Sequence, residues 1–216
     1  LFDPEAREVP SEQSKYFGRV KDPLLKFVNF NRLFNVGSYR ENNNYLANRP
    51  SQTFLGAHSV FNFYSPTYTP NGQFSALGLV VPELQVITPE TIVSDASLVA
   101  YLSTREQLTY WNSTNPSDEF TEHLTYAVVH DLAPLMDRLE TSDLSAVIDF
   151  VDEYMTQRQL SMSMKNELET FFSPKLQQIL SADYFQSEEH RIADIHGLLG
   201  SLIYQISLTP EYSQQK

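Results

Sequence analysis

The stretch SDLSAVIDFVDEYM, residues 142–155, carries the most regular hydrophobic pattern in the chain. Its apolar side chains recur at spacings of three and four, which places them on one face of an α-helix. Ser142 stands just before them and is a typical N-cap residue. The stripe consists of Leu144, Val147, Ile148, Val151, Tyr154 and Met155. The stretch therefore predicts an amphipathic helix with one buried face.

A second apolar stripe follows after a short polar interval. Its members are Met164, Leu168, Phe171 and Phe172, again at helical spacing. Two helices that are joined by a short turn pack antiparallel to each other. The sequence therefore predicts a helical hairpin over residues of about 142–172.

Three further helices are expected from their start and stop signals. Asp22-Pro23 and Thr88-Pro89 each combine an N-cap residue with proline at the first helical position. A terminal helix is expected over about 187–208, where acidic residues at the start favour the helix dipole. Glycine inside a helix costs about 1 kcal/mol relative to alanine. Gly197 and Gly200 of the terminal helix thus predict a close approach of another helix.

Between the first two of these helices, residues 38–76 lose helical periodicity and are rich in Asn, Pro, Phe and Tyr. Long irregular segments in compact domains are usually functional or packed as ordered loops. The expected fold is mainly α: an irregular orthogonal helical array with a long ordered aromatic loop and little or no sheet. Residues 1–216 would form a single helical domain or the C-terminal portion of a larger domain.

Charge and composition exclude several classes of function. The chain has 15 basic and 27 acidic residues, a net charge of -12, and contains no strongly basic patch. An acidic surface repels phosphate backbones, so no nucleic-acid partner is expected. The complete lack of cysteine excludes disulfides and thiolate chemistry. No run reaches 18 apolar residues, so no membrane span is expected.

The residues that could support catalysis or bind a metal form no known motif. The chain has five histidines, and His190 shares a helix face with a possible ligand, Asp194, four residues on. Such a pair is common by chance, so no metal site is predicted. No serine lies in a nucleophile elbow and no glycine-rich phosphate loop is present. Accordingly, no cofactor and no catalytic residue are assigned.

The aromatic loop is the strongest candidate for a contact surface. Phe61, Phe63, Tyr64 and Tyr68 stand between polar and proline residues, and flat rings can contact a sugar, a peptide or a protein. The alternative is that these rings pin the loop onto the helical core. The two tyrosines are expected to be more exposed than Phe61, because a hydroxyl tolerates water. His58 joins Phe63, Tyr64 and Tyr68 as a candidate ligand or partner contact.

Several motifs together resemble a bacterial family known as domain of unknown function eighteen hundred. They include Asp3-Pro4-Glu5-Ala6-Arg7, Asp22-Pro23-Leu24 with Arg32-Leu33-Phe34, and above all the aromatic block Ser59–Pro66 with its continuation through Gly78–Gln85; the ending Leu208–Tyr212 is also similar. The resemblance covers essentially the whole chain. His58 stands where the family commonly has proline.

The resemblance implies a mostly helical bacterial protein that is often exported, with a periplasmic or extracellular location. Such proteins are often encoded beside a second, phosphatase-like protein, and no reaction is established for them. The chain starts at Leu1 without an initiator Met, so we expect that an N-terminal half is missing and is one partner, a second exported protein being another.

Two hypotheses on function follow. The first is an interaction or accessory module without catalysis in this segment. The alternative is part of a hydrolase that acts on a cell-surface polymer, with its main catalytic groups in the missing half and His58 or Glu83 contributing from this one. A cleft that holds His58 beside several carboxylates would favour the hydrolase, whereas an exposed apolar patch would favour the interaction module.

Overall fold

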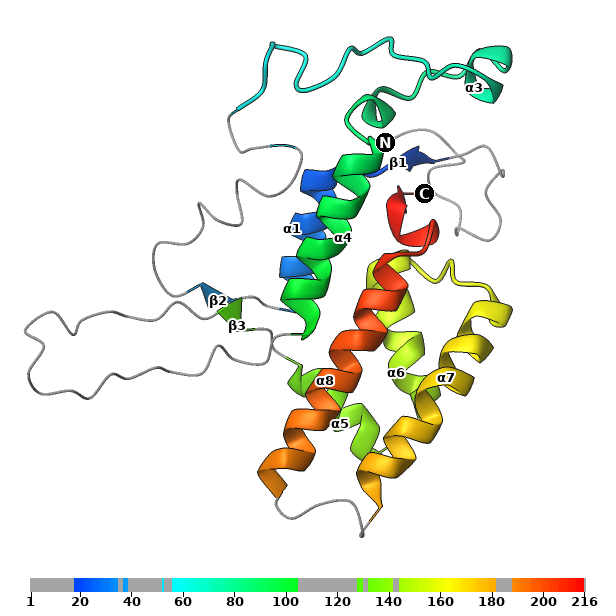
Figure 1. Cartoon of the computed structure of the whole chain (residues 1–216). Coiled ribbons are helices and arrows are strands. Elements are labelled where there is room, and N and C mark those ends of the chain that lie inside the picture. The colour runs from blue at the N-terminus through cyan, green and yellow to red at the C-terminus, as the bar shows by residue number, and fades with distance from the viewer. Residues whose placement is uncertain are drawn as a thin grey trace, which may run out of the picture.

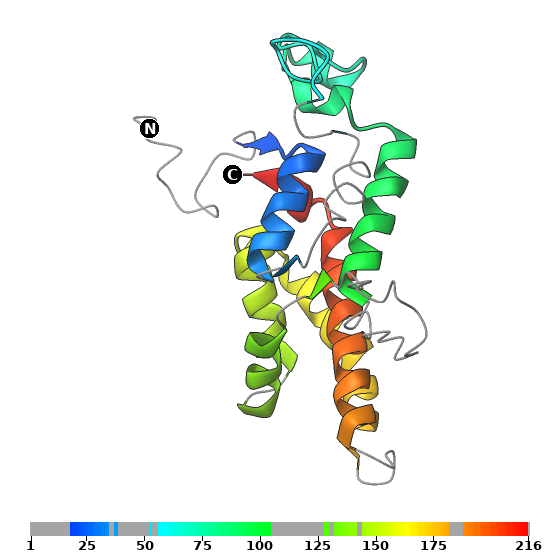
Figure 2. The ribbon, with the colours of Figure 1, turned by 90° about the vertical axis from the view of Figure 1, so that its left-hand side faces the viewer.

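The computed structural model describes residues 18–34, 37–38, 52, 56–104, 128–129, 132–141, 144–181 and 188–215. This part of the chain is mainly helical, as predicted. Its strands form two short antiparallel pairs: β1 (Arg19–Val20) with β4 (Gln214–Gln215), and β2 (Gly37–Ser38) with β3 (Val128–Val129). The predicted orthogonal arrangement is not confirmed. The axes of helices α4 (Pro89–Thr104) and α8 (Glu188–Ser207) are roughly aligned in both views, with the two helices running in opposite directions (Figure 1 and Figure 2).

Helix α1 (Pro23–Leu33) begins where the sequence predicts. The Asp22 carboxylate accepts a hydrogen bond from the backbone N–H of Leu25 at 2.9 Å, which caps one of the open donors of the first turn. A second open donor, Leu24 N–H, bonds to the buried side chain of Gln52 at 3.0 Å. Helix α4 is capped in the same way, since the Thr88 hydroxyl accepts from Thr91 N–H at 3.2 Å.

The core lies among α1, the C-terminal residues and four helices of the second half of the chain. These are α5 (Ala133–Thr141), α6 (Leu144–Val151), α7 (Met162–Leu180) and α8. The fully buried apolar side chains are Val147, Val151, Ile179, Leu199, Leu202 and Ile206. The predicted hairpin is present as α6 and α7, which contact each other. Its second helix extends past the expected end at 172 and through Pro174, because Leu176 and Ile179 continue the buried face.

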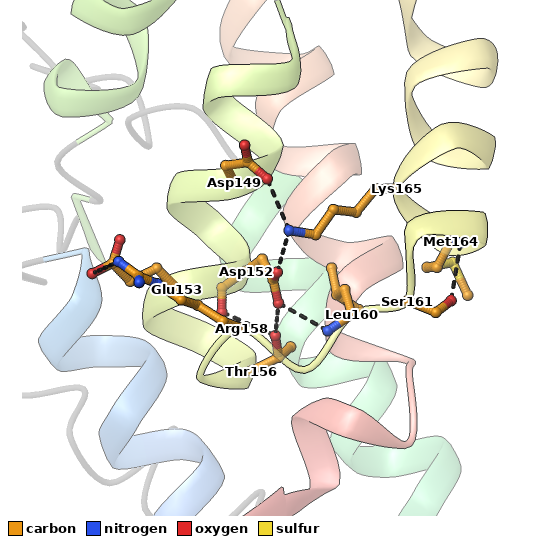
Figure 3. Close-up of polar contacts among 9 residues, drawn as sticks. All are labelled: Asp149, Asp152, Glu153, Thr156, Arg158, Leu160, Ser161, Met164 and Lys165. Atoms are coloured by element: carbon orange, nitrogen blue, oxygen red, sulfur yellow. Dashed lines mark hydrogen bonds and ion pairs between the residues drawn. The ribbon is translucent and has the colours of Figure 1, made fainter. Parts of the chain in front are cut away.

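A buried carboxylate organises the turn of this hairpin (Figure 3). The turn contains a π-helical segment, η3 (Asp152–Thr156), and the Asp152 side chain is fully buried there. Asp152 accepts hydrogen bonds from the Thr156 hydroxyl and from Leu160 N–H, the latter at 3.1 Å. Lys165 Nζ lies 2.6 Å from Asp152 Oδ2 and 2.8 Å from Asp149 Oδ1. Desolvation disfavours the charged form of Lys165. The hydrogen bonds of the ammonium to both carboxylates have the larger combined effect and raise the pKa of Lys165.

Helix α4 packs against α8, as a close approach of another helix requires, but the prediction is wrong for Gly197. Gly197 was expected to permit a close approach of another helix. A Cβ atom at this position would meet no heavy atom within 4 Å outside its own helix backbone and chain neighbours. The loss of helix stability caused by Gly197 is therefore not offset by closer packing of another helix at its Cα.

The C-terminal segment returns to α1 and encloses a lysine. Lys21 N–H donates to Ser213 O at 2.8 Å, and the Tyr212 hydroxyl donates to Lys26 O at 2.8 Å. The Lys21 side chain is buried; its ammonium donates to Met155 O at 3.2 Å and lies 5.1 Å from the centre of the Tyr212 ring. Burial, with a smaller effect of the Lys26 charge, lowers the pKa of Lys21 from 10.5 to about 8.

This lowered pKa predicts that the protein becomes more stable as the pH rises from about 8 towards 10. In that window the unfolded chain keeps the Lys21 proton while the folded chain releases it, so unfolding takes up a proton. Above pH 10 the tyrosines of the unfolded chain ionise and oppose the trend, because burial raises the pKa of Tyr212 from its ordinary 10.0. Urea midpoints measured between pH 7.5 and 9.5 should rise for the native sequence. A Lys21→Met variant should show a smaller rise, with Lys26, whose pKa burial also lowers, as the remaining contributor, and an equal rise in both proteins would contradict the assignment.

Candidate functional site

Residues 56–88 form an arm that leads into α4. The arm contains one short helix, α3 (Gln73–Ala76), and one 3-10 turn, η2 (Pro82–Gln85). In both views it lies at one end of the molecule, beyond the first turn of α4 (Figure 1 and Figure 2). No residue of the arm is buried. Of the predicted loop 38–76, residues 39–51 and 53–55 lie outside the described residues.

Hydrogen bonds within the arm hold its two halves together. Ser65 N–H donates to the side chain of Gln85 at 2.7 Å, and Val81 N–H donates to Tyr68 O at 2.9 Å. The chain reverses between these bonds at Gly72 and Gly78, whose φ angles of 98° and 65° favour glycine. The arm thus has a defined backbone without a buried side chain.

The arm exposes an unusual amount of apolar surface. Val60 is 94% exposed, Phe61 62% and Leu77 60%. Within the described part of the chain, eight of fifteen exposed large hydrophobic side chains lie between residues 60 and 93. The other five of these eight are Phe74, Leu79, Val80, Ile92 and Val93. Exposed apolar side chains that gather in one segment mark an interaction site more often than scattered single residues do.

The same region contains few charged residues. Sequence motifs and hydrophobic periodicity do not reveal this depletion. Residues 50–82 contain no Asp, Glu, Lys or Arg. At the chain's average of 19%, these 33 residues would carry about six charged side chains. Charge depletion with aromatic enrichment distinguishes the cores of protein interfaces from the remaining surface. The distribution of charged residues along the sequence is therefore sufficient by itself to indicate the arm.

Three of the four predicted contact residues come together. His58, Phe63 and Tyr64 line an open hollow of about 520 Å³ in the arm, whereas Tyr68 does not. The rings of His58 and Phe63 meet edge to face with their centres 5.9 Å apart. The hollow is also lined by Ser59, Phe61, Asn62, Ser65, Pro66 and Gln85. Its rings, hydroxyls and amides suit apolar contact with a few hydrogen bonds.

The expected order of exposure among the rings is wrong. Tyr64 and Tyr68 are half-buried, whereas Phe61 is 62% exposed. The Tyr64 hydroxyl donates to Asp22 Oδ2 at 3.4 Å, a long bond that holds the ring against the start of α1. Burial raises the pKa of Tyr64, and the carboxylates of Asp22 and Glu83 add to the shift. Phe61 lies at the tip of a turn closed by Ser59 and Asn62, which directs it outward.

Among the described residues that line the hollow with His58 there is no carboxylate, and Glu83 is not one of them. A histidine acting as a general base is normally oriented by a second polar group, often a carboxylate. Among the described residues, no cluster of three or more His, Asp or Glu side chains could hold a metal ion. In the same part of the chain, no helix is both long enough and apolar enough to cross a membrane.

Comparison with known proteins adds no relative. No family model matches the chain, no curated protein matches it, and no solved structure does either.

Proposed function

We propose that this chain is an interaction or accessory module, and that the arm (56–88) with the first turn of α4 is its contact surface. The observation that carries the proposal is the combination of exposed apolar side chains and missing charges over the same residues. Exposed apolar surface alone is normal for a protein. A stretch that lacks charges as well has the composition of an interface core.

The partner on this proposal is a protein with an uncharged, largely apolar patch. The net charge of -12 comes almost entirely from residues outside the arm. Within the arm, Glu83 is the one charged side chain. A partner patch with an apolar centre and a basic rim would complement this distribution. The resemblance to the eighteen-hundred family supports a bacterial, periplasmic or extracellular setting. It also supports two sources of the partner: another part of the same protein, or a second exported protein.

Photo-crosslinking from single positions tests the contact surface. A benzoyl-phenylalanine in place of Phe61 reports on the arm, and the same group in place of Phe171 in α7 is a matched control. Both are phenylalanines and both are exposed, by 62% and 72%. In the cells that naturally make the protein, we expect position 61 to give one defined crosslinked product that position 171 does not give.

A second variant shows whether the product depends on the apolar surface. Val80→Asp places a charge at an exposed arm position, and such a charge at an interface core costs binding several kcal/mol unless it is paired. The crosslink from position 61 should then largely disappear. Absence of a product from position 61, or identical products from both positions, would refute the proposed surface.

A further inference from the structure

A cavity of about 330 Å³ lies between α1 and α4, away from the hollow that holds His58. Phe27 and Phe30 of α1 face Ile92 and Val99 of α4 across it, and Leu84 and Ile87 approach from the end of the arm. The C-terminal segment from Ser207 to Gln214 closes another side. The volume is at the lower end of the range typical of small-molecule sites, which are also mostly apolar.

In the described part of the chain, two charged side chains line this cavity, and they have opposite signs. Lys26 comes from α1 and Asp95 from α4. Burial lowers the pKa of Lys26, while the charges of Asp95 and Asp22 oppose this shift. Asp95 is therefore near enough to Lys26 to compensate its charge. Because these two opposite charges offset each other, neither a carboxylate nor a cation gains a net attraction that repays its lost hydration, so the cavity favours neutral molecules.

The cavity also offers hydrogen-bond donors. The Lys26 ammonium donates to Ser213 Oγ at 2.9 Å. An ammonium has three N–H donors, which leaves Lys26 able to donate to a ligand oxygen. Asp95 cannot play that part while it is ionised, because a carboxylate only accepts hydrogen bonds.

We infer that this cavity binds a small neutral molecule with a hydrocarbon body and a single acceptor oxygen, such as a cyclic ketone or alcohol. The hydrocarbon packs between the two helices, and the oxygen accepts a hydrogen bond from Lys26. This inference does not rest on the proposed function, although Leu84, Ile87 and Ile92 line the cavity and also belong to the proposed contact surface.

Ligand-observed NMR titration of the whole chain with four shape-matched adamantane derivatives tests this inference. The probes are adamantan-2-one, adamantan-1-ol, adamantane-1-carboxylate and adamantan-1-amine. The ketone and the alcohol should bind at least about tenfold more tightly than the acid and the amine, because a charged head group loses its hydration without a compensating partner. Binding of none of the four, or equally tight binding of a charged probe, would overturn the inference.

Two variants locate the binding and test the compensation of charge. Ala96→Leu fills space in the cavity and should abolish ketone binding, whereas Ala76→Leu in the exposed helix α3 should leave it unchanged. Asp95→Asn leaves Lys26 as the one charged lining residue, so adamantane-1-carboxylate should gain at least about tenfold and rival the ketone. Ketone binding that survives Ala96→Leu, or an acid that gains nothing from Asp95→Asn, would contradict the site.

Discussion

Replacing Asp152 with alanine should lower the free energy of unfolding by about 3 to 5 kcal/mol, the range found when one partner of a buried ion pair is removed. The substitution takes away the acceptor of Leu160 N–H and of the Thr156 hydroxyl, and one of the two carboxylates that contact Lys165. Leu160 N–H would lose its acceptor in the interior. The Thr156 hydroxyl would keep its bond to Asp152 O at 2.9 Å, and Lys165 would keep its contact with Asp149. Urea denaturation at pH 7 measures the loss directly.

Asp149 provides a matched control for this prediction. Its carboxylate contacts the same Lys165 Nζ at 2.8 Å, but its side chain is 63% exposed. Exposed ion pairs contribute about 0 to 1 kcal/mol. Asp149→Ala should therefore cost less than about 1 kcal/mol, and similar losses for both variants would show that the burial of Asp152 does not decide the stability of the turn.

Replacing Leu202 with alanine should cost about 3 to 5 kcal/mol, through lost apolar burial and a cavity in the core. Leu202 is fully buried in α8, where it belongs to the cluster that joins α8 to α6 and α7. Alanine retains the helix propensity, so the loss reports packing and not helix formation.

The same leucine-to-alanine substitution can be made at an exposed site, Leu180. It is 52% exposed at the end of α7. Leu180→Ala should cost under about 1 kcal/mol, because surface substitutions have small effects. Calorimetry of both variants gives the two losses; a small loss for Leu202→Ala would mean that α8 is not part of a tightly packed core.

The helices were predictable because their signals are local. Asp22-Pro23 and Thr88-Pro89 specify helix starts through capping and through the missing N–H of proline, and both starts are observed. The apolar stripe of 144–151 similarly determines which face of α6 is buried. Tyr154, a later member of the same predicted stripe, is 57% exposed because it lies in the π-helical segment after α6. Such signals depend on residues within one or two turns.

Contacts between distant residues were not predictable in the same way. The bonds of Lys21 to Met155 and of Tyr212 to Lys26 join residues more than 130 positions apart. The role of Asp152 depends on a π-helical turn that brings Leu160 N–H to its carboxylate. No spacing rule anticipates these pairs, because tertiary packing brings them together.

The sequence identifies the aromatic residues of the candidate site, but it does not predict correctly how exposed their rings are. The hydroxyl groups predict that the two tyrosines are more exposed than Phe61. Tyr64 instead turns inward because Asp22 offers an acceptor near the start of α1. The apolar side chains that extend the surface, such as Leu77 and Val80, were assigned no role, because an apolar run is equally consistent with burial.

The claim that the arm is free to bind a partner and does not support the fold is tested most directly by the free energy of unfolding of a Leu77→Asp/Val80→Asp double variant. Both side chains are exposed, by 60% and 53%. We predict a value within about 0.5 kcal/mol of the native sequence, as for most surface substitutions. A loss of about 2 kcal/mol or more, typical of a charge placed in a buried site, would show that these residues are part of the core and would contradict the proposed contact surface.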